Sequence, residues 1–202
     1  MHSDWRCLLD GSIVPLHVAE HIDTAIVGSV ASRIQSTGPR RLPMWCPWPL
    51  PVGWTMTGVG WAGDDHRGVL ASVVACSGPC PVEHGPADLL LVAEEPGVGL
   101  GARYAGIPGP DPGPHLLEEV RDTPAHARVH ADGWPTPLWS SESAPDRSVY
   151  VGEARGLWLY IISWPSAAGY VLAEELHLHD LGESVPSQLA YGAPSPYLHG
   201  KA

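Results

Sequence analysis

The stretch WTMTGVGWAGDDHRGVLASVVACS, residues 54–77, sets the expected fold class because it contains two β-type runs joined by a polar turn. The runs Trp54–Ala62 and Val69–Ser77 flank the glycine-bounded loop Gly63–Gly68, a pattern that predicts a β hairpin. The apolar run Asp88–Ala93 follows at strand length. A hairpin followed by a third strand is therefore expected in the first half of the chain.

The second half of the chain repeats this type of pattern. Asp132-Gly133 is a strong signal for a two-residue hairpin turn. Residues 152–155 are predicted to form the next turn, and an antiparallel meander is the simplest arrangement. The order of apolar residues and a repeated Ala-Glu-Glu suggest two similar three-stranded units. The strands of this half are expected at Ala127–Ala131, Trp134–Ser140, Ser148–Val151, Gly156–Trp164 and Gly169–Leu181.

Few segments favour helix. Apolar spacing in Asp23–Ile34 predicts a helix with Asp23 as its N-cap, and Gly97–Gly106 permits at most a short, glycine-loosened helix. Pro43–Trp54 carries too many prolines for a helix or a central strand, so it should be an extended ribbon on the core. The predicted class is α+β and β-rich. The expected division is an N-terminal segment 1–39, a core domain 40–181 and a C-terminal tail 182–202.

Composition excludes several classes of function. The 202 residues carry a net charge of −11, which disfavours nucleic-acid binding through phosphate neutralisation. No apolar run approaches the roughly 20 residues that span a bilayer, and the first residues do not resemble a secretory signal. A cytoplasmic location, no membrane partner and four reduced thiols are therefore expected. One Lys, no Phe and nine Trp are typical of a G+C-rich genome.

Three motifs suggest chemistry but also have structural explanations. Gly97-Val98-Gly99-Leu100-Gly101 lacks the spacing of a phosphate-binding turn, so a tight structural turn is expected. Glu94-Glu95 and Glu174-Glu175 are paired carboxylates, but neighbouring side chains of a strand point to opposite faces. Solvated charge at a sheet edge is the expected state of both pairs. His177 and His179, with Asp180 beyond, are a metal or proton-transfer surface or simply a half-exposed strand.

Two surfaces are candidates for function. The first is an aromatic and glycine-rich binding surface, for an unknown small molecule or protein; its residues are Trp45, Trp48, Trp54, Gly97, Gly99 and Gly101. The second is a loop-rich cluster of polar side chains that would act on a small ligand; its candidate catalytic residues are Glu94, Arg103, Tyr104, Asp111 and His115. Convergence of the second set in one pocket would favour an enzyme.

The motifs PMWCPWPLPVGW, TGVGWAGDD, LLVAEEPGVGLGARYAGIPGPDPGPH and GEARGLWLYIISWP together resemble an uncharacterised family of actinobacterial proteins over roughly residues 40–180. The resemblance implies a zinc-ribbon-like element before this domain, of the form C-P-x-C-G-G followed by C-D-x-H-G. The present chain keeps Cys7 and Gly11 of the second half and has Asp10 in place of the family's His. Zinc is therefore expected only if the element is completed upstream.

Some members of that family are labelled phosphotransacetylase, which implies acyl or phosphoryl transfer. Such chemistry requires cationic groups that bind anions, and Arg103 and Arg155 are the candidates in this sequence. Two hypotheses follow. The chain is a non-catalytic binding or regulatory module, or it is an enzyme that acts on a small ligand.

Overall fold

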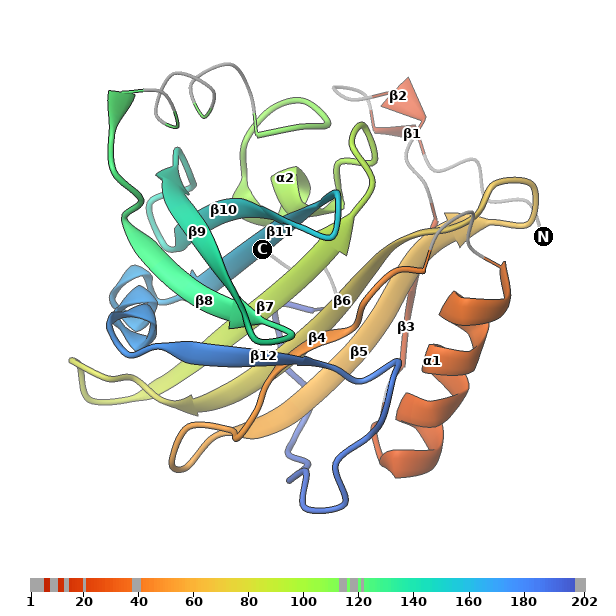
Figure 1. The fold of residues 1–202 in the computed structure, drawn as a ribbon, viewed down its shortest axis with the longest axis horizontal. Coiled ribbons are helices and arrows are strands. Elements are labelled where there is room, and N and C mark those ends of the chain that lie inside the picture. The colour runs from red at the N-terminus through yellow and green to blue at the C-terminus, as the bar shows by residue number, and fades with distance from the viewer. Residues whose placement is uncertain are drawn as a thin grey trace.

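A ten-stranded sheet dominates the computed structural model, which describes residues 6–7, 11–12, 15–19, 21–37, 41–112, 116, 120 and 122–198 (Figure 1). The order of its strands is β3-β5-β6-β7-β11-β10-β9-β8-β12-β4. The short strands β1 (Arg6–Cys7) and β2 (Gly11–Ser12) pair separately. The large sheet comprises β3 (Leu16–Val18), β4 (Trp45–Pro47), β5 (Thr55–Asp64), β6 (Gly68–Pro79), β7 (Pro86–Glu94), β8 (Ala127–Ala131), β9 (Trp134–Ser141), β10 (Ser148–Ala154), β11 (Leu157–Trp164) and β12 (Leu176–Asp180).

The first predicted hairpin is confirmed. Strands β5 and β6 pair antiparallel from Thr55 opposite Ser77 to Asp64 opposite Gly68, and β7 then pairs with β6. The turn is stabilised by Asp64, whose Oδ1 accepts hydrogen bonds from the backbone N–H groups of His66 (2.8 Å) and Arg67 (2.7 Å). The polar loop therefore provides the bonds that reverse the chain.

The helices are short, as expected for an α+β, β-rich chain. Helix α1 (Thr24–Thr37) begins after Asp23, whose Oδ1 accepts the N–H of Ile26 at 2.8 Å, so the predicted N-cap is confirmed. Helix α2 (Leu100–Ala105) lies between Gly99 and Gly106, whose φ angles are 84° and 74°. These left-handed conformations suit glycine, and they limit the helix to six residues.

The predicted strand Gly169–Leu181 is wrong in its first part. Residues Ser166–Ala173 form a 3-10 helix, η1, and only Leu176–Asp180 form strand β12. Strand β11 is already paired on both edges, with β7 and β10, so the chain that follows has no free edge beside it. Strand β12 instead pairs with β8 and β4, and the expected pair of similar three-stranded units does not form.

The sheet curls so that β12 and β4 lie across the long strands β5, β6 and β7 (Figure 1). Alternating residues of the long strands enter two separate apolar clusters, one on each face. The first contains Leu89 and Leu91 of β7 together with Trp45, and the second contains Leu90 and Val92. Residues outside the expected core domain 40–181 also belong to these clusters, since Ile34 lies in the first cluster and Leu198 in the second.

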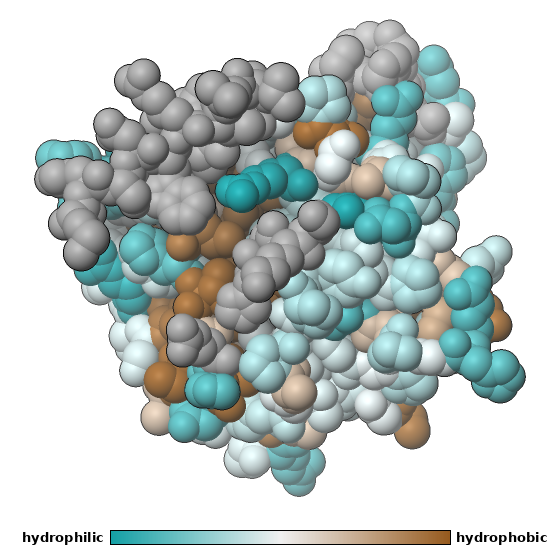
Figure 2. Space-filling view, turned by 180° about the vertical axis from the view of Figure 1, so that it is seen from behind, coloured by the Kyte–Doolittle hydropathy of each residue, from teal (hydrophilic) through white to brown (hydrophobic). Residues whose placement is uncertain are grey.

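From behind (Figure 2), an elongated group of hydrophobic residues lies among mainly hydrophilic ones.

Among the residues described, no helix has the length and apolar character needed to cross a membrane. Cys46, Cys76 and Cys80 are buried and unpaired, which agrees with the expected thiols at these three positions.

Candidate functional site

An open hollow of about 740 Å³ lies beside two hairpin turns. One turn, Asp132-Gly133, joins β8 to β9, and the other, Arg155-Gly156, joins β10 to β11. The second turn was predicted at residues 152–155. Gly152 remains paired within β10, so the turn itself is formed later, by Arg155 and Gly156. All four turn residues have positive φ, from 52° to 79°, as two-residue hairpin turns require. We call this site the acidic hollow.

Asp132 and Arg155 are the two non-glycine residues with positive φ in the described part of the chain, and they form an ion pair with each other. Glycine, Asn or Asp suits such a position better than Arg, so the backbone of Arg155 is held in an unfavourable conformation. Strained backbone of this kind tends to occur at functional sites. The two turns are thus linked by the side chains of their most constrained residues.

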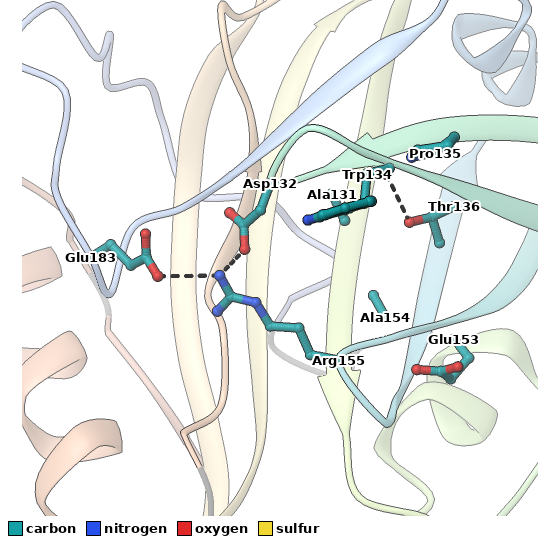
Figure 3. Close-up of a pocket in the computed structure, with 9 residues that line it drawn as sticks. All are labelled: Ala131, Asp132, Trp134, Pro135, Thr136, Glu153, Ala154, Arg155 and Glu183. Carbon is teal, nitrogen blue, oxygen red and sulfur yellow. Dashed lines mark hydrogen bonds and ion pairs between the residues drawn. The ribbon is translucent and has the colours of Figure 1, made fainter.

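Arg155 is the centre of the acidic hollow. Its side chain extends from the turn towards Asp132 and Glu183 (Figure 3), and its Nη2 lies 3.1 Å from Glu183 Oε1. Its Nη1 donates to Asp180 Oδ2 at 3.0 Å, and its guanidinium lies 5.1 Å from the ring centre of Trp45. Three carboxylates and one indole ring therefore fix a single guanidinium.

Asp180 connects the acidic hollow to the core. Its side chain is 0% exposed, and its Oδ1 accepts the backbone N–H groups of Met44 (2.9 Å) and Gly182 (2.8 Å). The other oxygen, Oδ2, accepts from Arg155. A buried carboxylate is tolerated when its lone pairs are satisfied and a cation is adjacent, so Arg155 and Asp180 depend on each other.

The rim of the acidic hollow combines negative charge with an exposed aromatic ring. Trp134, the first residue of β9, is 76% exposed and lines the hollow beside Ala131 (Figure 3). Glu153 also lines it, although its carboxylate points away from Arg155 and accepts the N–H of Gly156 at 2.6 Å. Arg41 pairs with Glu183 at 3.4 Å. The site thus combines four carboxylates with two guanidinium groups, which leaves it negatively charged.

Among the candidate catalytic residues, Glu94 and Asp111 come together. Glu94 Oε2 accepts the N–H groups of Leu100 (2.7 Å) and Gly101 (3.1 Å), and Asp111 Oδ1 accepts that of Gly97 at 2.8 Å. Burial raises the pKa of Glu94 to about 8, the two backbone hydrogen bonds oppose this shift, and the nearby Asp111 adds to it.

The remaining three candidates lie apart from Glu94 or outside the described residues. Tyr104 donates its hydroxyl to the carbonyl of Leu198 at 2.6 Å, and Arg103 is an exposed residue of α2. His115 lies outside the described residues. The structure therefore unites two of the five residues and does not bring Tyr104 or Arg103 to the Glu94 carboxylate.

The expectation that Glu94 is a solvated edge charge is wrong, since its side chain is 0% exposed. The chain after β7 folds back and directs the N–H groups of α2 at this carboxylate. The glycine-rich segment thus binds a carboxyl group of the protein itself. A Cβ on Gly101 would lie 2.3 Å from the ring of Tyr160. The expected tight structural turn is confirmed. Glu174 and Glu175 are exposed, as predicted.

The candidate binding residues fall into two groups on different faces of the sheet. Trp45 and Trp54 are buried in the first apolar cluster, and Trp48 packs against it while partly exposed. Gly97 and Gly99 precede α2 and Gly101 lies within it, and α2 packs in the second cluster. These two groups do not share a surface, and Trp45 reaches the acidic hollow only through Arg155.

The candidate zinc ligands are Cys7 and Asp10. Asp10 and the side chain of Cys7 lie outside the described residues. Within the described part of the chain, no group of three or more His, Cys, Asp or Glu side chains could hold a metal ion. His177 stacks on His130 with ring centres 4.8 Å apart, and His179 lies 2.8 Å from the carbonyl oxygen of Ser184. Both histidines therefore have partners within the protein.

Comparison with known proteins identifies a family. A family of unknown function, DUF6758, matches residues 1–198. The chain belongs to this family. No curated protein and no solved structure matches the chain. The function of the DUF6758 family is unknown, so the geometry of the site is the guide to what this chain does.

The sequence pointed to parts of the acidic hollow without assembling it. Asp132-Gly133 was recognisable as a turn and Arg155 as a cation, but their ion pair depends on how β8–β9 and β10–β11 are placed. Asp180 lies on β12, which pairs with β8 although the two strands are far apart in the chain, and Glu183 follows β12. The available signal was a non-glycine residue before Gly133 and before Gly156, at two positions where the chain reverses.

Proposed function

We propose that the chain is a non-catalytic binding module and that the acidic hollow binds a positively charged side chain of a protein partner. The observation that carries this proposal is Trp134, a large aromatic residue that is 76% exposed at the rim of a carboxylate-rich site. An exposed indole gains little for folding, but it attracts cations through its ring face. Neighbouring carboxylates favour the same ligand.

The internal ion pairs of the acidic hollow support recognition of a second cation. Arg155 pairs with Asp132, Asp180 and Glu183, so its charge is neutralised within the protein. The carboxylates of Glu183 and Glu153 are exposed, and together with Trp134 they form the rim. A lysine or arginine side chain placed over Trp134 would lie in the same hollow as both carboxylates. Complementary charge of this type gives specificity and speeds association.

Calorimetric titration with a tetralysine peptide tests the proposal. We expect saturable binding to the wild-type chain that weakens as salt is added. Trp134→Ala should weaken binding by roughly threefold to thirtyfold, the range expected for loss of a cation–π contact. Tyr170→Ala is the matched control, because Tyr170 is 63% exposed and does not line the hollow. Equal affinities for wild type and Trp134→Ala would refute the proposal, because the peptide would then be bound only through the overall negative charge of the protein.

A second candidate, an enzyme that acts on a small ligand, for example by acyl or phosphoryl transfer, is favoured by Glu94. A carboxyl group whose pKa is raised to about 8 beside Asp111 is typical of general acid–base sites. Thermal-shift screening with acyl phosphates, nucleotides and metals tests this function. A ligand that stabilises the wild type but not Glu94→Gln would support it, and absence of any such ligand would argue against it.

We further propose an actinobacterial origin and a cytoplasmic location. The support is compositional, since a chain with nine Trp, no Phe and one Lys is typical of a G+C-rich genome. Zinc binding by Cys7 is proposed only in combination with an upstream half of a ribbon. Metal analysis of a chain extended upstream tests it, and absence of stoichiometric zinc would refute it.

A further inference from the structure

A small cavity of about 50 Å³ lies on the other face of the sheet, where α2, the end of β11 and the C-terminal segment meet. It is smaller and more enclosed than the acidic hollow. We call it the α2 cavity. A buried water needs roughly 10–15 Å³ of such space, so the α2 cavity has room for a group of a few heavy atoms. Its lining residues are Leu16, Leu100, Arg103, Tyr104, Arg147, Trp164 and Tyr197.

Arg147 provides a fixed guanidinium in the wall of the α2 cavity. Its side chain is 6% exposed, and its Nε and Nη2 donate to the carboxylate of Asp146 at 2.6 Å and 3.0 Å. Its Nη1 donates to the carbonyl of Tyr104 at 2.6 Å, and the group lies 4.9 Å from the ring centre of Trp164. A guanidinium has five N–H donors, so two remain after these three bonds.

Arg103 brings a second guanidinium to the same cavity. It is exposed on α2, and no described residue forms an ion pair or hydrogen bond with its side chain. The lining residues include no carboxylate, and Asp146 beside them balances only Arg147. The α2 cavity is therefore positively charged within a chain whose net charge is −11.

The aromatic residues of the α2 cavity form an apolar wall beside these charges. Trp164 and Tyr197 stack with ring centres 4.5 Å apart, and Leu16 and Leu100 complete the lining. A convergence of two guanidinium groups with an apolar wall favours an anionic head group attached to a small apolar or planar body.

We propose that the α2 cavity binds a small oxyanion, either a carboxylate or a phosphate group, between Arg103 and Arg147. Arg147 is held in place before binding by its bonds to Asp146 and Tyr104. Arg103 is the free cation that closes over the ligand. This site is independent of the acidic hollow, because it lies in the second apolar cluster and requires a ligand of opposite charge.

The test uses the full chain labelled with 5-fluorotryptophan and observed by ¹⁹F NMR. Sodium phosphate and sodium acetate are titrated separately at constant ionic strength, with chloride as the balancing anion. We expect the Trp164 resonance, assigned by Trp164→Phe, to shift saturably while that of Trp134 stays fixed. Saturation by both anions would indicate general oxyanion recognition, and saturation by one would assign the head group as phosphate or carboxylate.

Two arginine variants make the test specific. Arg103→Ala removes an exposed side chain, so it should leave the fold intact and weaken anion binding at least about tenfold. Arg128→Ala is the matched control, because Arg128 is exposed on β8 and does not line the cavity. Shifts that remain linear with both anions, or equal affinity in wild type and Arg103→Ala, would overturn the proposal. Neither result would affect tetralysine binding at Trp134, so failure at one site is distinguishable from failure at the other.

Discussion

Asp180 and Glu94 are both fully buried carboxylates, each of which accepts two backbone N–H groups, but they lie in different surroundings. Asp180 also has the guanidinium of Arg155, whereas no described cation contacts Glu94. Two N–H donors do not offset burial for Glu94, whose pKa is raised to about 8. The two surroundings differ in charge, since Asp180 contacts a guanidinium, whereas Glu94 has no such contact and lies near the carboxylate of Asp111, which adds to the rise in its pKa.

The largest effect is expected from Arg155→Asn. Asn suits the positive φ of this turn, so the substitution removes the guanidinium without adding backbone strain. Asp180 would be left as a buried charge without a cation, at a cost of about 3–5 kcal/mol in the free energy of unfolding. Urea unfolding measures this loss of stability, and Arg67→Ala in the exposed β5–β6 turn is the control. A loss below about 1 kcal/mol would remove the distinction between the two carboxylates.

Glu94 should make stability depend on pH. Its pKa is raised from 4.5 to about 8 in the folded chain, so its contribution is complete below about pH 4.5 and is lost as pH rises through about 8. Between pH 5 and pH 7 the free energy of unfolding should fall by roughly 2–3 kcal/mol through this group alone. Glu94→Gln should remove that part of the pH dependence. Parallel curves for wild type and variant would show that Glu94 is not responsible.

Gly101→Ala probes the start of α2, whose N–H groups bind Glu94. A Cβ at this position would meet the ring of Tyr160 at 2.3 Å, so the variant should lose about 1–3 kcal/mol of stability through overcrowding. Gly28→Ala in α1 is the opposite case, since no atom lies within 4 Å of the added Cβ. It should gain about 0.5–1 kcal/mol from reduced chain entropy. Thermal unfolding of both variants separates crowding from the general effect of replacing glycine.

The smallest change in stability is expected from Trp134→Ala. The ring is 76% exposed, so its removal should alter the free energy of unfolding by no more than about 0.5 kcal/mol. Chemical denaturation of this variant measures the change. A loss of several kcal/mol would mean that Trp134 supports the fold, and its exposure would no longer argue for binding.

The elements of this fold follow largely from local sequence, and their spatial arrangement does not. The hairpin at residues 54–77, the Asp23 cap and the Asp132-Gly133 turn are set by neighbouring residues, and all three are confirmed. The helix η1 was missed because the pairing of β11 with β7 joins segments far apart in sequence. Long-range pairing of this kind leaves no local signal.

The same limit applies to the sites. Glu94 was recognisable as a chemically unusual residue, but its burial depends on the return of the chain into α2. The acidic hollow joins residues from β8, β10 and the segment after β12, and the α2 cavity joins residues from both halves of the chain. Arg147 carried no sequence signal because Tyr104 and Trp164, which its guanidinium also contacts, are distant in the sequence.

The proposed role of the acidic hollow is examined by ¹⁹F NMR of the 5-fluorotryptophan chain during titration with tetralysine, with tetraglutamate as the charge-reversed control. The Trp134 resonance, identified by its loss in Trp134→Phe, should shift saturably with tetralysine and stay unchanged with tetraglutamate. The Trp164 resonance should not move with tetralysine, since this residue belongs to the second apolar cluster. A Trp134 resonance that is insensitive to tetralysine, or that moves equally with both peptides, would contradict cation binding at this site.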